Sequence, residues 1–94
     1  MQLKRTGRTI VDKLRQAFSP EALEVTDDSD KHAGHAGARP EGETHFRVRI
    51  VATAFAGKSR IERHRMIHQV LAEELASNVH ALAITALSEE EKRR

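Results

Sequence analysis

The most restrictive feature of this sequence is the alternation of apolar and polar residues over 44–52. As a strand, this segment has one apolar face, formed by Phe46, Val48 and Ile50. Its other face is polar and carries His45, Arg47 and Arg49. We therefore predict a sheet that has helices packed on one face.

The residues before this strand predict a helix and another strand. Apolar residues at helical spacing indicate a helix over 9–18, with Thr9 and Asp12 as its N-terminal capping pair. Loose alternation indicates a strand over 22–26, which should pair with the strand over 44–52 in an antiparallel hairpin. The connection at 29–43 is rich in glycine and longer than most connections, so we expect a flexible loop with a function.

The residues after the strand over 44–52 predict two more helices and a third strand. Ser59 and Glu62 form a capping box, so a helix should begin there and continue to about Ala76. Residues 81–87 indicate a short buried strand, and a short acidic helix should follow it. The order is α-β-β-α-β-α, a two-layer α+β fold with a three-stranded mixed sheet. We expect one domain over 1–94, with a core at about 9–87 and a basic arm at 1–8.

Composition limits both the core and the chemistry. The chain has no tryptophan and no tyrosine, so the core must be built from aliphatic residues around Phe18, Phe46 and Phe55. It has no cysteine, which excludes disulfides, a cysteine nucleophile and thiolate metal ligands from this chain. No apolar stretch reaches the roughly 20 residues of a membrane span. The basic N-terminus lacks the apolar segment of a signal peptide, so we expect a cytoplasmic protein.

The sequence contains no motif for catalysis. It has no Gly-x-Ser-x-Gly elbow, no phosphate-binding loop and no dinucleotide fingerprint. We therefore expect no enzymatic activity and no small-molecule substrate. The formal net charge is +2, and basic and acidic clusters alternate along the chain. This pattern favours solvated faces of alternating sign over a dedicated surface for polyanions.

Six histidines are candidates for metal binding, and two of them share a helix. His64 and His68 are four residues apart, a spacing that places two imidazoles on one helix face and is found in zinc sites. The glutamate that zinc proteases carry beside the first histidine is missing. Helical phase puts His64 inside the apolar stripe, so a partly buried, structural role is favoured.

The remaining histidines lie outside the predicted helices. His32 and His35 flank Ala-Gly in the long loop, where glycine would let the chain close around an ion. Incidental histidines in a disordered loop explain that pair equally well. His80 stands at a helix-to-strand junction, where it presents an exposed side chain on rigid flanks or caps the preceding helix. His45 begins a strand.

Several segments, in this order and spacing, resemble the BolA family. They are Glu-Thr-His-Phe at 43–46, Phe-Ala-Gly at 55–57, Arg-His-Arg at 63–65 and Val-His-Ala-Leu-Ala-Ile at 79–84. The run at 28–37 resembles the histidine-type loop of that family. The resemblance covers residues 9–87 and implies a class II KH-like fold, in agreement with the predicted order of elements.

The resemblance implies a complex with a monothiol glutaredoxin that bridges a [2Fe–2S] cluster. The glutaredoxin and glutathione would give the sulfur ligands, and this chain would give histidines. In the family one ligand matches His80, and the other matches His32 or, alternatively, His35. Histidine in place of thiolate raises the potential and makes binding depend on pH. We expect the isolated protein to lack the cluster, and His45 and His64 to have structural or secondary roles.

The resemblance also implies transcriptional regulation through double-stranded DNA, linked in the family to stress response, morphology and biofilm formation. The matching basic residues are Lys58, Arg60, Arg63 and Arg65. The turn Gly57-Lys58-Ser59-Arg60 has the basic residues of a KH clamp but lacks its second glycine. Binding would therefore be mainly to phosphate and would depend strongly on salt.

Overall fold

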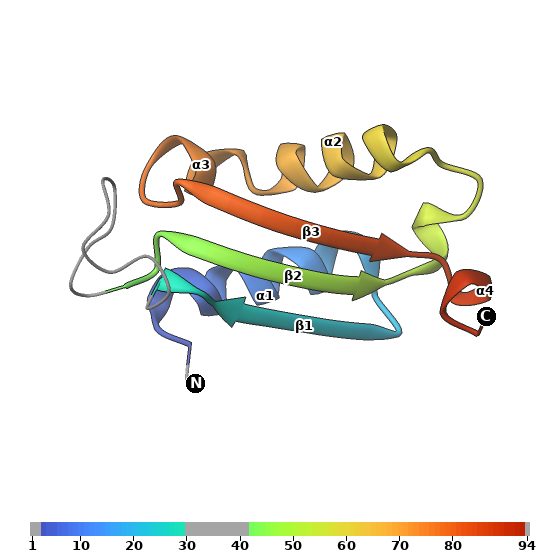
Figure 1. Ribbon diagram of the computed structural model, residues 1–94, viewed down its shortest axis with the longest axis horizontal. Coiled ribbons are helices and arrows are strands. Elements are labelled where there is room, and N and C mark those ends of the chain that lie inside the picture. Colours follow the sequence, from blue (N-terminus) through green and yellow to red (C-terminus); the bar gives the residue numbers. More distant parts are fainter. Residues whose placement is uncertain (1–2, 30–41, 94) are drawn as a thin grey trace.

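The computed structural model describes residues 3–29 and 42–93 of the chain (Figure 1). Its elements are α1 (Arg5–Phe18), β1 (Ala22–Asp27), β2 (His45–Val51), the 3-10 turn η2 (Thr53–Phe55), α2 (Arg60–Val70), α3 (Ala72–Ala76), β3 (Ala81–Leu87) and α4 (Glu89–Lys92). This order confirms the predicted α-β-β-α-β-α arrangement, with the second helix in two pieces.

The three strands form one mixed sheet in the order β1-β2-β3. β1 and β2 are antiparallel, so the predicted hairpin is confirmed, with Ala22 opposite Val51 and Asp27 opposite Phe46. β2 and β3 are parallel, with His45 opposite Ala81. A parallel pair needs a crossover connection, which α2 and α3 provide here.

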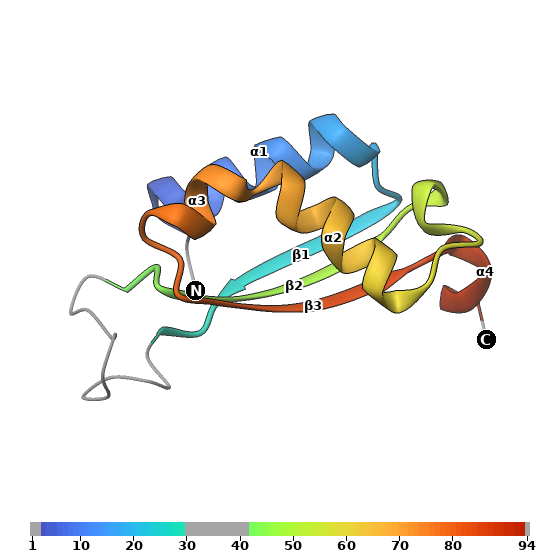
Figure 2. The ribbon, with the colours of Figure 1, turned by 90° about the horizontal axis from the view of Figure 1, so that it is seen from above.

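The helices α1, α2 and α3 lie on one side of the sheet, as Figure 2 shows from above. The predicted single covered face is therefore confirmed. Phe46, Val48 and Ile50 point into the core with exposures of 0–2%, whereas Arg47 on the opposite face of β2 is exposed. Phe55 is fully buried and its ring centroid lies 5.1 Å from that of the partly buried Phe18.

The prediction that 81–87 is a buried strand is wrong. β3 is an edge strand, and Ala81, Ala83 and Thr85 are exposed while the residues between them are partly buried. The segment contains no charged residue, which is why its sequence suggested burial on both faces. Small side chains tolerate the open face of the sheet, so composition alone misjudged the burial of this strand.

The predicted start of the first helix is also wrong. α1 begins at Arg5, so it includes four residues that the sequence assigned to a basic arm. Thr9 is not its N-cap: the Thr9 hydroxyl donates to the Arg5 carbonyl one turn earlier, at 3.0 Å. Lys4 is the N-cap and makes no side-chain capping bond. The first N–H groups of the helix are instead satisfied from a distant segment, described below.

The helix predicted to run to Ala76 is interrupted at Leu71. Its start is confirmed, because Ser59 and Glu62 form both hydrogen bonds of a capping box. At Leu71 the backbone leaves the helical region (φ −102°, ψ 20°), and α3 continues after it. Leu71 itself is 1% exposed, and neither glycine nor proline marks the break. Among the described residues, no helix is both long enough and apolar enough to cross a membrane.

Candidate functional site

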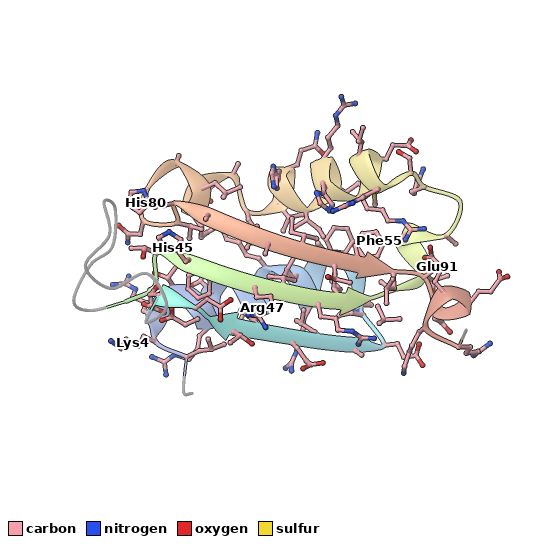
Figure 3. All side chains as sticks on the ribbon, in the orientation of Figure 1. Lys4, His45, Arg47, Phe55, His80 and Glu91 are labelled. Atoms are coloured by element: carbon pink, nitrogen blue, oxygen red, sulfur yellow. The ribbon has the colours of Figure 1, made fainter. Side chains whose placement is uncertain are left out.

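His45 and His80 lie together at one end of the sheet, where β2 and β3 both begin (Figure 3). The parallel register places His45 opposite Ala81, the neighbour of His80. The two imidazole rings have centroids 6.4 Å apart and are tilted by 34°. One imidazole from the first residue of β2 and one from the residue before β3 thus lie near each other at this end of the sheet.

His80 carries an exposed side chain on a fixed piece of backbone. Its N–H donates to the Thr44 carbonyl at 2.7 Å, and Val79 before it is only 4% exposed. The alternative prediction, that His80 caps the preceding helix, does not agree with the contacts at the end of α3. The Glu74 carbonyl of α3 accepts the N–H groups of Ser77 and Val79, and the Glu73 carbonyl accepts the Ser77 hydroxyl.

Thr44 connects the two histidines to the base of the long loop. It is completely buried, and its N–H donates to Ser29 Oγ at 2.9 Å. Its hydroxyl lies 2.9 Å from His45 Nδ1 and 3.3 Å from Ser29 Oγ. Its carbonyl accepts the N–H groups of His80 and Ala81. A single buried threonine therefore orients the His45 ring and holds the backbone of His80.

Asp27 fixes the residues on both sides of segment 30–41. Its carboxylate accepts the Ser29 N–H at 2.9 Å and the Glu43 N–H at 3.0 Å. Burial raises the pKa of Asp27, but the hydrogen bonds from Ser29 and Glu43 outweigh burial, so that the pKa lies below its usual value. Asp27 is therefore ionised near neutral pH and clamps the loop base as an acceptor.

Glu43 links the loop base to the start of α1. Its carboxylate accepts the Gly7 N–H at 2.8 Å and the Thr6 N–H at 3.3 Å. This carboxylate satisfies N–H groups in the first turn of the helix and complements its dipole. Glu43 has φ 63° and follows Gly42 with φ 77°, so two successive residues are left-handed in this turn. A Cβ on Gly42 would lie 3.0 Å from Asp27 Oδ2, so glycine is required there for a second reason.

The other histidines proposed from the sequence are not part of this cluster among the described residues. His32 and His35 lie outside the described residues. His64 is half-buried, as helical phase predicted, and it lines a groove beside the far end of β3. His68 is exposed on α2. Within residues 3–29 and 42–93, no three metal-ligating side chains come together.

The four basic residues proposed for DNA contact do not share one environment. Lys58, Arg60 and Arg65 are exposed. Arg63 is buried, with 11% of its side chain exposed, and donates to the carbonyls of Lys58 and Ala86 at 3.0 and 2.9 Å. Its guanidinium also pairs with Glu91 at 2.6 Å. Arg63 thus ties the start of α2 to the end of β3 and to α4.

Sequence reasoning did not identify Asp27, Glu43 or Thr44 as parts of this site. Each acts through a partner that is distant in the sequence, such as Gly7 for Glu43 and His80 for Thr44. The one available signal was the segment Glu-Thr-His-Phe at 43–46, which carries two of them. The contact of Thr44 with the backbone of His80 becomes visible only when β2 and β3 are paired.

Comparison with protein-family models matches residues 14–91 to the family described as BolA-like protein. The chain is 50% identical over 84 residues to SufE-like protein 1, chloroplastic/mitochondrial, from Arabidopsis thaliana, covering 85% of this chain and 23% of that protein. The solved BolA domain of the Arabidopsis protein SufE1 has a TM-score of 0.87 and 47% identity, and the match covers 96% of this chain and 99% of that one.

Two further relatives carry names that bear on function. BolA-like protein 1 from Mus musculus is 54% identical over 74 residues, covering 79% of this chain and 51% of that protein. The DNA-binding transcriptional regulator BolA from Escherichia coli (strain K12) is 49% identical over 75 residues, covering 80% of this chain and 68% of that protein. The chain thus spans about a quarter of the Arabidopsis protein and about half of the mouse protein.

Proposed function

This chain belongs to the BolA family, and from that premise we propose that it gives histidine ligands to a [2Fe–2S] cluster shared with a monothiol glutaredoxin. One observation carries the proposal. The exposed His80 stands on backbone held by Thr44, and Thr44 also bonds Ser29 at the start of the long loop. The His80 side chain and the residues on both sides of segment 30–41, which contains His32 and His35, therefore lie at one end of the sheet.

The donors on this chain fit half of such a site. A [2Fe–2S] cluster takes four ligands, which are thiolates or, in part, histidines. The chain has no cysteine, and the described residues bring only two imidazoles together, those of His45 and His80. Thiolates from the glutaredoxin and glutathione would supply the rest. When bound, the cluster would supply a labile iron–sulfur unit for trafficking or for iron and redox sensing.

The chain's own residues hold the ligands in place. Thr44 fixes the backbone of His80 and orients His45, whose role is secondary in this proposal. Asp27 holds Ser29 and Glu43, which lie before and after the segment that contains His32 and His35. The second ligand is His32, with His35 as the alternative, on the strength of the family resemblance.

Anaerobic reconstitution of this protein with a monothiol glutaredoxin and glutathione tests the proposal. We expect the visible circular dichroism of the mixed complex to differ from that of the glutaredoxin alone. His80→Ala should remove that difference, whereas the exposed His68→Ala on α2 should retain it. If His80→Ala retains the full spectrum, His80 is not a ligand.

We propose as a second function that the chain is a DNA-binding regulator of stress-response, morphology and biofilm genes. The observation in its favour is the name of the Escherichia coli relative, a DNA-binding transcriptional regulator. The contact surface would comprise Lys58, Arg60 and Arg65, which are exposed. We leave Arg63 out, because its guanidinium is committed to Ala86 and Glu91.

Salt-dependent binding to a mixed-sequence duplex tests this second function. Replacing Lys58, Arg60 and Arg65 with alanine should weaken binding and reduce the slope of log affinity against log salt by about 0.9 per lost phosphate contact. Arg15→Ala, on the exposed side of α1, is the matched control and should leave the slope unchanged. Equal binding by the triple variant and the wild type would remove this surface from consideration.

A further inference from the structure

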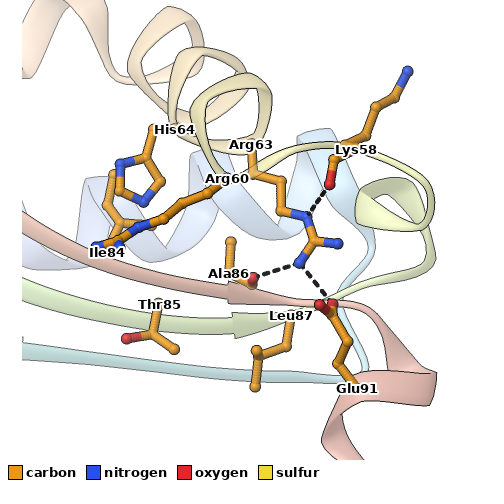
Figure 4. A pocket seen from close by; sticks show the side chains of 9 residues that line it. All are labelled: Lys58, Arg60, Arg63, His64, Ile84, Thr85, Ala86, Leu87 and Glu91. Atoms are coloured by element: carbon orange, nitrogen blue, oxygen red, sulfur yellow. Dashed lines mark hydrogen bonds and ion pairs between the residues drawn. The ribbon is translucent and has the colours of Figure 1, made fainter.

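A groove of about 310 Å³ runs between the start of α2 and the end of β3. Arg60, Arg63 and His64 line it on the helix side, and Ile84, Ala86 and Leu87 line it on the strand side (Figure 4). In that view Arg60 extends along the strand toward Ile84, and Lys58 points away from it. The groove lies at the opposite end of β3 from His80, so its function does not rest on the histidine site (Figure 3).

The strand that borders this groove has an unpaired edge. β3 pairs with β2 and with no other described strand. The Ala81 N–H and the Leu87 carbonyl are bonded on the β2 side. Because backbone groups alternate along a strand, those of Leu82, Ile84 and Ala86 face outward. Arg63 donates to the Ala86 carbonyl at 2.9 Å and so covers the last of these positions. Leu82 and Ile84 remain as the open part of the edge.

The rim of the groove has uncompensated positive charge. Its one acidic residue, Glu91, is paired with Arg63 at 2.6 Å and also accepts the Ser88 N–H at 2.7 Å. Arg60 is exposed, and no ion pair of its side chain is found among the described residues, whereas Lys58 interacts electrostatically with Glu62 and points away from the groove. A ligand in this groove would therefore meet the Arg60 guanidinium next to a strand edge.

We propose that this groove binds an extended, acidic segment of a partner protein, which adds to the sheet as a strand beside β3. Backbone pairing would use the N–H and carbonyl groups of Leu82 and Ile84, and an acidic side chain of the segment would pair with Arg60. A second copy of this chain would bring two rims of like charge together. A DNA duplex would satisfy Arg60, but its phosphates have no N–H to offer the outward carbonyls of β3.

A short capped peptide that alternates valine and glutamate is a suitable probe for the full-length protein. Its matched control has the same sequence with N-methyl groups on the alternate amides that would face β3, which preserves the charge but prevents pairing. We expect the unmodified peptide to slow amide exchange at Leu82 and Ile84 by about tenfold at saturation. The N-methylated peptide should leave that exchange unchanged.

Variants on the protein side separate charge from pairing. Arg60→Glu lies at an exposed helix start and should raise the Kd for the acidic peptide by about tenfold, and Arg60→Lys should raise it less. Equal binding of the two peptides, or exchange at Leu82 and Ile84 that does not slow, overturns the proposal. The proposal is also overturned if a DNA duplex binds the groove and the acidic peptide does not. It is overturned too if self-association alone protects the amides of Leu82 and Ile84.

Discussion

Thr44 is the residue on which the geometry of the histidine edge depends. It is fully buried, and its three polar groups contact Ser29, His45 and the backbone of His80. Buried polar groups that lose a partner cost more than exposed ones, because water cannot replace the bond. The identity of this residue therefore affects both the loop base and the orientation of the His45 ring.

Replacing Thr44 with valine keeps the shape of the side chain and removes the hydroxyl. We expect the free energy of unfolding to fall by about 1–3 kcal/mol, because Ser29 and His45 each lose a polar contact. Thr26→Val, at an exposed position of β1, is the control and should change stability by less than about 0.5 kcal/mol. Urea denaturation measures both, and an equal effect of the two substitutions contradicts the role given to Thr44.

Gly42 and Gly57 form a matched pair at the residue scale. Both have positive φ, 77° and 74°, so alanine is strained at either position. At Gly42 the new Cβ would also lie 3.0 Å from Asp27 Oδ2, whereas at Gly57 nothing lies within 4 Å. We expect Gly57→Ala to cost about 1–2 kcal/mol and Gly42→Ala to cost more. Equal losses in urea denaturation would mean that the Asp27 clamp does not crowd this position.

At the scale of elements, helix ends explain what the sequence could and could not predict. The capping box predicted at Ser59 is confirmed because its partner, Glu62, lies within one turn. The start of α1 was misplaced because its acceptor, Glu43, is 36 residues from Gly7. Arg63 was assigned to a surface for the same reason, since its partner Glu91 is 28 residues away. Local patterns cannot reveal contacts of this kind.

Glu43→Ala tests the remote cap of α1. Removal of the carboxylate leaves the N–H groups of Thr6 and Gly7 without that acceptor, so we expect a loss of about 1 kcal/mol. The rate of amide exchange measured by NMR should increase more at these two residues than in the rest of α1. Glu24→Ala, on the exposed face of β1, should do neither. Unchanged exchange at Gly7 would show that water replaces the carboxylate without cost.

The contribution of the Arg63–Glu91 contact to stability should depend on pH. Hydrogen bonds from the Ser88 backbone and from Arg63 lower the pKa of Glu91 from 4.5 to about 2. A carboxyl group whose pKa is lower in the folded state stabilises the protein fully above its unfolded pKa, and that contribution is lost as the pH falls. The Tm difference between wild type and Glu91→Gln should therefore be largest near neutral pH and shrink between pH 4.5 and about 2. A difference that stays constant over this range contradicts the assignment.

At the scale of the whole molecule, the two ends of β3 carry different chemistry. His80 and His45 lie at its start, and the basic groove lies at its end. The sequence predicted the layers and the strand pairing, because alternation in β2 and helical spacing in α1 are local signals. It did not predict the edge position of β3, because burial of that strand depends on which elements cover it. The pairing of His45 with His80 likewise depends on the parallel register of β2 and β3.

Pulsed EPR of the reduced, co-reconstituted complex tests the central claim most directly, with histidine labelled with ¹⁵N in this chain alone. We predict two ¹⁵N couplings to the cluster, of which His80→Ala removes one, whereas His64→Ala and His68→Ala retain both. Couplings that are absent in the wild type, or that survive in His80→Ala unchanged, would contradict the assignment of His80 as this chain's ligand.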